Sequence, residues 1–164
     1  PQLERWAKGR EASLHIISGR DPEAEERWGE LRVQRAPWSK EHLKHAASRA
    51  RLGIIPARPS LKNSWLKPAS RVRCLFALGV PAIGDSRVPD VRQFAAACHA
   101  PVAGSDSEWL RSLEELWSNP TELDGLAVRG HRAVADGWSA NQTAFRWLRH
   151  LDAEFTRQPE ALAN

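Results

Sequence analysis

The sequence predicts an α/β fold: a Rossmann-like parallel sheet with helices on both faces. Two observations predict it. Short apolar runs alternate with longer segments of helical spacing along most of the 164 residues. The apolar runs also end in glycine or proline, as strands that enter loops do. Strands that alternate with helices favour a parallel sheet, because parallel neighbours need a helical crossover between them.

The first third of the chain contains two predicted strands. SLHIIS at 13–18 is apolar and β-branched, and LRVQR at 31–35 alternates with period two. Ser39 is a favoured N-cap residue for the helix that follows. In order, we expect the end of a helix at 3–8, a strand at 13–18, a short helix at 23–29, a strand at 31–35 and a helix from Ser39 to about Arg51.

The rest of the chain has clearer start and stop signals. Pro68 suits a first helical position, Gly79 suits a helix end, and Ser105 with Glu108 has capping-box spacing. In order, we expect a strand at 52–55, a loop at 57–67, a helix from Pro68 to Gly79, a strand at 80–84, a helix at 91–97, a marginal strand at 101–102 and helices at 105–118, 122–136 and 140–157.

Length and composition predict one domain at 1–138, followed by a helical tail at 139–164 that packs on it. The chain has 24 Lys and Arg against 20 Asp and Glu, scattered rather than in blocks, so a mixed solvated surface is favoured over a nucleic-acid interface. The longest uncharged stretches are too short to cross a bilayer. We therefore expect neither nucleic-acid binding nor a transmembrane segment.

The only two cysteines are Cys74 and Cys98. Both stand in apolar helical surroundings, so we expect buried free thiols rather than a disulfide or a metal pair. Unpaired thiols suit a reducing compartment, which predicts a cytoplasmic location. The chain begins at Pro1 and has no methionine, and we interpret it as an excised piece of a longer protein.

The helix that begins at Pro68 is the main candidate for a binding site. Its N-terminus carries unpaired N–H groups and the positive end of the helix dipole, and Lys67 and Arg71 add full charges there. This combination predicts an anion site, most plausibly for phosphate. The alternative is that both side chains are solvated charges that cover apolar surface.

Other loops are expected at the same edge of the sheet. In an open parallel sheet the ligand crevice lies beyond the carboxyl ends of the strands. Gly19, Trp38, the 57–67 loop and the 85–90 loop follow such ends. Asp85 and Asp90 could accept a sugar hydroxyl there or serve as turn and cap residues, and Trp38 could stack on a base or pack at the rim.

Four segments together resemble a known family. They are KPASRVRCLFALGVPAIGD at 67–85, VPDV at 88–91, SEWLRSLEELWSNPTEL at 107–123 and GHRAVADGWSANQTAFRWLRHL at 130–151. In order and spacing they resemble the C-terminal, donor-binding half of a GT-B glycosyltransferase of the family 1/family 4 type. The resemblance covers about residues 13–151. It implies a bacterial, cytoplasmic hexosyltransferase-like enzyme that transfers a sugar from a nucleoside diphosphate sugar to an acceptor.

The resemblance also implies a set of site residues and partners. The diphosphate would lie on the helix that begins at Pro68, and no metal or further cofactor is implied. The missing N-terminal, acceptor-binding half would be a partner, the fragment alone would be inactive, and peripheral membrane contact would come through the parent protein. No catalytic residue is assigned, and the implied nucleotide-sugar-binding residues are Gly19, Trp38, Lys67, Ala69, Ser70, Arg71 and Asp90.

The sequence departs from the family pattern at its carboxylates. Many family 4 enzymes carry two glutamates spaced E-x7-E, and those positions hold Leu66 and Cys74 here. Asp90 stands where a glutamate is more usual. The family's carboxylate contacts to sugar and ribose are therefore not carried over. The alternative function is a non-catalytic nucleotide- or partner-binding module on the same fold.

Overall fold

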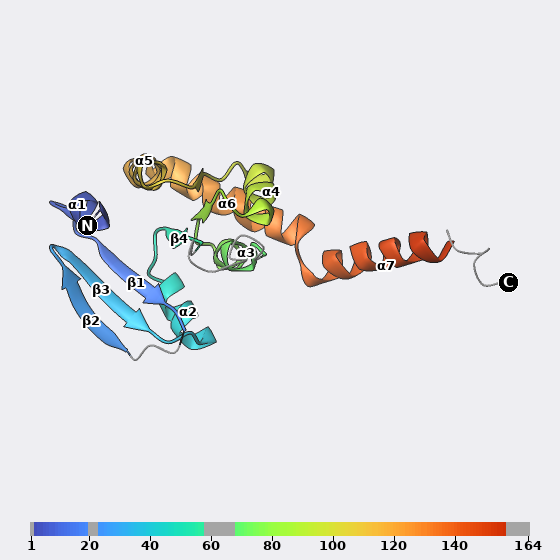
Figure 1. Ribbon diagram of the computed structural model, residues 1–164, viewed down its shortest axis with the longest axis horizontal. Helices are drawn as coiled ribbons and strands as arrows, with labels where there is room; N and C mark the ends of the chain where they lie inside the picture. The colour runs from blue at the N-terminus through green and yellow to red at the C-terminus, as the bar shows by residue number, and fades with distance from the viewer. Residues whose placement is uncertain (1, 20–22, 58–67, 157–164) are drawn as a thin grey trace.

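The computed structural model describes residues 2–19, 23–57 and 68–156, and it shows an α/β fold (Figure 1). A parallel three-stranded sheet flanked by helices forms its larger part. The sheet has the order β4-β5-β6, with β4 at Gly53–Ile55, β5 at Ala82–Asp85 and β6 at Val102–Ala103. Ile54 pairs with Ile83, and Gly84 pairs with Val102. These strands match the predicted runs to within two residues at either end.

The other described strands form a second sheet, so the expected single sheet is wrong. Its order is β1-β3-β2, with β1 at Ser13–Ile17, β2 at Ala24–Trp28 and β3 at Leu31–Ala36. β1 and β3 are parallel, as predicted, whereas β2 and β3 form an antiparallel hairpin. The division arises because β1 pairs only with β3 and β4 pairs only with β5, so each is an edge strand of its own sheet.

The helix expected at 23–29 is strand β2 instead. Its residues alternate between exposed and half-buried after the first, which is the period of a strand. Glu26 pairs across the hairpin with Arg35 at 2.6 Å, and Gly29 takes a φ of +61° in the tight turn to β3. Cross-strand charge pairs and a glycine turn therefore override the helical preference of the glutamates.

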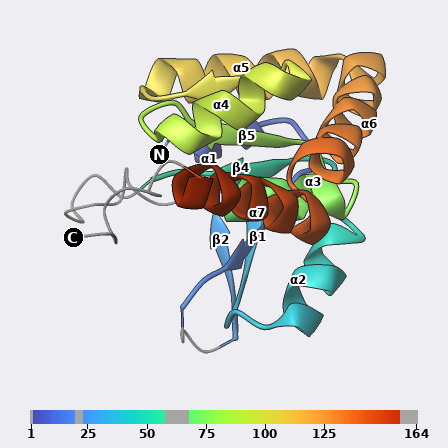
Figure 2. The same ribbon diagram turned by 90° about the vertical axis from the view of Figure 1, so that its right-hand side faces the viewer.

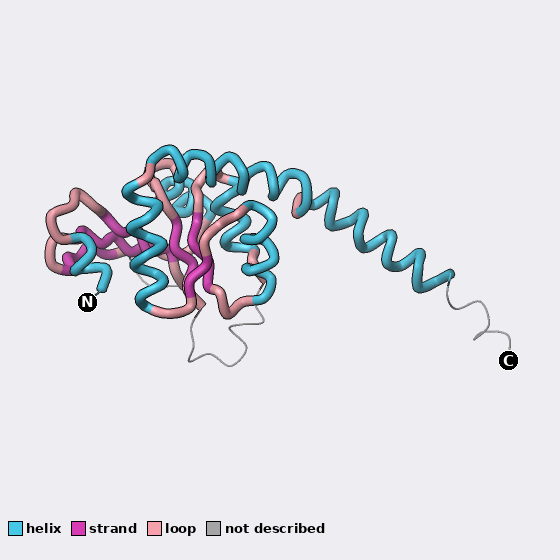
Figure 3. The backbone as a smooth tube through the Cα atoms, turned by 90° about the horizontal axis from the view of Figure 1, so that it is seen from above, coloured by secondary structure: helices cyan, strands magenta, loops and turns pink. Residues whose placement is uncertain are grey.

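Helices flank the parallel sheet on both sides (Figures 2 and 3). α3 (Ser70–Ala77) and α4 (Pro89–Cys98) pack on β5. A Cβ on Gly84 would lie 2.3 Å from Val91 in α4 and 3.4 Å from Val72 in α3, so both helices approach the same glycine. α5 (Asp106–Ser118) packs on β5 and β6, and α6 (Pro120–Gly137) packs on α3, α4 and α5.

The main core lies between this sheet and its helices. Phe76 and Phe94 are fully buried, with ring centroids 5.4 Å apart, and Trp138 stands edge-on to Phe94 at 5.2 Å. α6 approaches α3 closely through Gly130, where a Cβ would lie 1.9 Å from the Phe76 ring. The close packing of α6 on α3 therefore depends on the absence of a side chain at Gly130 and on the large ring of Phe76.

α1 (Gln2–Ala7) joins the two sheets. Trp6 contributes to the hydrophobic clusters of both, and its ring meets Trp117 of α5 edge-on with centroids 5.1 Å apart. Trp6 Nε1 donates to Glu114 at 2.8 Å, and Arg10 pairs with the same carboxylate at 3.0 Å. One short helix thus fastens the β1-β3-β2 sheet to α5.

The helix ends confirm most of the start and stop signals. Ser39 accepts from His42 N at 3.0 Å and caps α2, which covers Lys40–Ala47 and is shorter than expected. The capping box of Ser105 and Glu108 is present at the start of α5. α3 ends before Gly79, as predicted, but begins at Ser70 with Ala69 as its N-cap, so Pro68 is not its first residue.

The last helix, α7 (Ala140–Thr156), extends away from the rest of the molecule (Figures 1 and 3). Phe145, Trp147 and Leu148 on it are 58–63% exposed, where the sequence predicts a tail packed on the domain. No helix in the described part of the chain is long and apolar enough to cross a membrane.

Candidate functional site

The carboxyl ends of β4, β5 and β6 meet at one edge of the parallel sheet, as the sequence predicts for a ligand crevice. Three carboxylates lie at the end of β5 or in the segments after these strands, and each accepts hydrogen bonds from nearby backbone N–H groups. They are Asp85, Asp90 and Glu108. We call these three carboxylates and their hydrogen-bond partners the strand-end edge. The negative charges at this edge are carboxylates of the protein itself.

Asp85 is the buried member of the strand-end edge, with 1% of its surface exposed. It is the last residue of β5, and its Oδ2 accepts from Ala57 N at 2.8 Å, just after β4. Oδ1 accepts from Arg87 N and Nε, both at 2.9 Å, and Oδ2 accepts from Arg87 Nη2 at 2.6 Å. Asp85 thereby ties the ends of two strands to one arginine.

The environment of Asp85 keeps it ionised. Burial alone would raise the pKa of its carboxyl, but the hydrogen bonds from Arg87 and Ala57 and the charge of Arg87 outweigh burial, so the pKa is lowered. The same pair raises the pKa of the Arg87 guanidinium through the hydrogen bond to Asp85. The pair is thus charged on both sides across the physiological pH range.

Asp90 accepts a hydrogen bond from a backbone N–H group at the start of α3. It belongs to the first turn of α4, and its Oδ2 accepts from Ala69 N at 2.6 Å and from the Arg73 guanidinium. Arg73 Nε is buried and has no hydrogen-bond partner within the described residues. A protein carboxylate therefore occupies one N–H group that the sequence assigns to phosphate.

Glu108 has the same role at α5. Its Oε2 accepts from Gly104 N at 2.8 Å and from Ser105 N at 2.9 Å, and these hydrogen bonds lower the pKa of its carboxyl. A Cβ on Gly104 would lie 2.4 Å from Ser86 Oγ in the neighbouring loop, so the backbone approaches that side chain closely. The segments after β5 and β6 are consequently in close contact.

Two of the residues predicted to bind the nucleotide sugar, Gly19 and Trp38, lie close together at the ends of strands of the β1-β3-β2 sheet. Gly19 follows β1 and Trp38 follows β3, and Trp38 N donates to Gly19 O at 3.3 Å. Gly19 has a φ of +49°, which favours glycine, and Trp38 is 61% exposed. An exposed indole beside a turn fits a stacking surface or a rim residue equally well.

The remaining predicted residues lie around the start of α3. Ala69 is buried, whereas Ser70 and Arg71 are exposed. Lys67 and Leu66 lie outside the described residues. Cys74, at the second expected glutamate position, is exposed, so the prediction that it is buried is wrong, while Cys98 is buried and free as predicted. Cys74 is exposed because it stands on the face of α3 opposite Val72 and Phe76.

Sequence reasoning did not single out Arg73, Arg87 or Glu108 as parts of a site. Arg73 pairs with a residue 17 positions away, so nothing local marks it. Arg87 stands two residues after Asp85, and this short acid–base spacing at a strand end was the available signal. Glu108 was recognised only as a helix cap.

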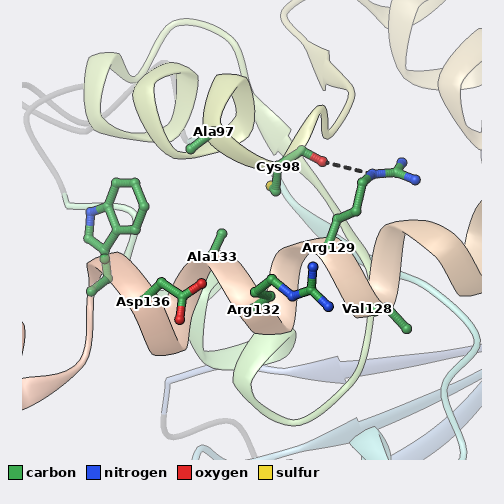
Figure 4. Close-up of a pocket in the computed structure, with 9 residues that line it drawn as sticks. Ala97, Cys98, Val128, Arg129, Arg132, Ala133 and Asp136 are labelled. Atoms are coloured by element: carbon green, nitrogen blue, oxygen red, sulfur yellow. Dashed lines mark hydrogen bonds between the residues drawn. The ribbon is translucent and has the colours of Figure 1, made fainter.

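A cavity of about 380 Å³ lies elsewhere, between α4 and α6 (Figure 4). Arg129, Arg132 and Asp136 line it from α6, and Cys98 lines it from α4. Arg129 is already bound to Cys98 O at 3.2 Å and to Glu122 at 2.6 Å. Burial raises the pKa of the Cys98 thiol, which makes it a poor nucleophile. The cavity therefore does not assemble a reactive group.

No protein-family model, curated protein or solved structure matches this chain. Within the residues that the structure describes, no group of three or more His, Cys, Asp or Glu side chains could hold a metal ion.

Proposed function

We propose that the chain is the donor-binding half of a cytoplasmic GT-B glycosyltransferase and binds a nucleoside diphosphate sugar. One observation carries the proposal: the ends of three parallel strands meet beside the starts of α3, α4 and α5. This is the position at which open α/β sheets bind nucleotides. The resemblance of residues 67–151 to the donor-binding half supports the same reading.

The diphosphate would lie at the start of α3. The exposed Arg71 would supply positive charge, and the backbone at Ser70 would supply an N–H group. Lys67, three residues before Ser70 in the sequence, is predicted to add a second positive charge. In the transfer reaction these groups would stabilise the charge that grows on the leaving nucleoside diphosphate. Gly19 and Trp38 follow strands of the β1-β3-β2 sheet rather than this edge, so the diphosphate site at α3 does not include them.

Calorimetric titration with UDP, GDP, UMP and GMP tests this proposal. We expect saturable binding of one diphosphate and at least about tenfold weaker binding by the Lys67→Ala/Arg71→Ala variant, since two charged contacts are removed. The Lys40→Ala/Lys44→Ala variant, with both changes on α2, is the matched control for net charge. Equal affinity of the site variant and the control would contradict the proposal.

A second candidate is a non-catalytic binding module on the same fold, and Asp90 favours it. Its carboxylate already takes the Ala69 N–H and pairs with Arg73, which places negative charge where a phosphate would approach. If this module binds a partner rather than a nucleotide, nucleotide binding is undetectable in the wild type and stays so in Asp90→Asn. Under the donor-binding proposal, the same change strengthens binding, because it removes a competing anion.

A further inference from the structure

We propose that Arg87 is a phosphate-binding residue of the strand-end edge and that Asp85 is the positioning residue that orients it. This inference rests on the proposed function, because it names a further contact for the same diphosphate. The resemblance to glycosyltransferases does not single out Arg87. The inference comes from the geometry of the Asp85–Arg87 pair alone.

Two hydrogen bonds to Asp85 fix the orientation of the Arg87 guanidinium. Arg87 binds Asp85 through Nε and Nη2, at 2.9 and 2.6 Å, so one edge of its plane is fixed. Nη2 also lies 3.4 Å from Ala57 O. Nη1 takes part in no hydrogen bond with the described residues. Because the guanidinium is planar, Nη1 points away from the Asp85 carboxylate.

Asp85 and Arg87 differ in their exposure to solvent. Asp85 is 1% exposed on its side chain, whereas Arg87 is 43% exposed. The cation that neutralises this buried carboxylate reaches solvent at the carboxyl end of β5. A guanidinium held on one edge retains donors on its outer edge, and this geometry suits phosphate.

Two other arginines near the strand-end edge, Arg73 and Arg92, differ from Arg87. Arg73 is less exposed, at 21%, and its guanidinium is directed to Asp90. Arg92 donates through Nη1 to Ser86 O at 2.6 Å. Arg87 therefore combines a fixed orientation, a nitrogen without a hydrogen bond to the described residues and exposure to solvent, a combination that neither of these neighbours offers.

The test uses the intact chain and sodium pyrophosphate, with UDP and GDP titrated in parallel. The main variant is Asp85→Asn/Arg87→Gln, which removes one negative and one positive charge and so leaves the net charge unchanged. It also avoids leaving the buried carboxylate without its partner. Glu122→Gln/Arg129→Gln removes another 2.6 Å ion pair, on α6, and is the matched control. Circular dichroism verifies folding, and Arg87→Lys is the second variant.

We expect pyrophosphate to bind the wild type and the control equally, and the main variant about tenfold or more weakly, which corresponds to one lost charged hydrogen bond. Arg87→Lys, which keeps the charge but not the planar fork, should also lose affinity. If diphosphates bind and both Arg87 variants keep wild-type affinity, the inference is overturned while the proposed function stands. If the wild type binds neither pyrophosphate nor any nucleotide, both are overturned.

Discussion

At the scale of single residues, Asp85 stands out as a buried charge that is fully paired. Its carboxylate is 1% exposed and accepts hydrogen bonds from Ala57 and Arg87. A buried carboxylate without such partners would be strongly destabilising. The stability of this region should therefore depend on the ionised state of one side chain.

We predict that Asp85→Asn lowers the free energy of unfolding by about 2–3 kcal/mol at pH 7, because it breaks a buried ion pair whose arginine still reaches solvent. The pKa of Asp85 is lowered in the folded state, so its contribution is complete above the unfolded pKa of about 4 and disappears as the pH falls through the folded pKa.

Urea unfolding at pH 7 and at progressively lower pH measures this effect. The difference between wild type and Asp85→Asn should shrink in acid, whereas the exposed Asp124→Asn on α6 should change little at either pH. A difference between wild type and Asp85→Asn that is independent of pH would show that the carboxylate charge is not what stabilises this region.

At the scale of secondary-structure elements, two of the glycines of α6, Gly125 and Gly130, have opposite surroundings. A Cβ at Gly130 would lie 1.9 Å from the buried Phe76 ring, whereas a Cβ at Gly125 would lie 3.1 Å from the flexible end of Arg129. Alanine favours a helix over glycine by about 1 kcal/mol at either position. Packing, rather than propensity, should therefore separate the two substitutions.

We predict that Gly130→Ala destabilises the protein by about 1–3 kcal/mol through overpacking, and that Gly125→Ala is neutral or stabilising by up to about 1 kcal/mol. Denaturant unfolding of both variants measures the two effects. Equal effects of the two changes would contradict the close approach of α6 to α3.

The elements also show what the sequence could predict. Signals that act within one or two turns were sufficient: Gly79 ended a helix, and Ser39 and Ser105 capped two others. The helix predicted at 23–29 was wrong because its glutamates favour a helix locally, whereas one of them pairs with Arg35 on another strand. Pairing between strands is a tertiary property, so the division into two sheets was not readable from local patterns.

The candidate site was only partly predictable, for the same reason. The sequence placed the ends of β4, β5 and β6 together and picked Asp85 and Asp90 as crevice residues, but it also placed Gly19 and Trp38 there, which follow strands of the other sheet. It could not show that Asp90 binds Ala69, 21 positions away, or that Asp85 binds Ala57, 28 positions away. Long-range capping by carboxylates leaves no spacing that a single sequence reveals.

At the scale of the whole molecule, α1 links the two sheets. Trp6 packs in the hydrophobic clusters of both sheets and contacts Trp117. Edge-to-face aromatic pairs of this kind add about 0.5–1.5 kcal/mol beyond the area they bury. Removing Trp6 should therefore weaken the link between the sheets more than either sheet itself.

We predict that Trp6→Ala increases amide hydrogen exchange in β3 by about tenfold or more while β5 keeps its protection, since the smaller sheet can then open locally. Trp147→Ala, on the exposed face of α7, is the control and should change neither strand. Equal loss of protection in β3 and β5 would instead indicate that the molecule opens as a single unit.

The central claim, that a nucleoside diphosphate binds at the carboxyl ends of β4, β5 and β6, can be tested most directly by NMR. Amide chemical shifts of the isotope-labelled chain would be followed during titration with UDP and with GDP. We predict that one nucleotide shifts the amides of Ser70, Arg71 and Arg87 in a saturable way. Shifts confined to the cavity between α4 and α6, or no shifts with either nucleotide, would contradict the claim.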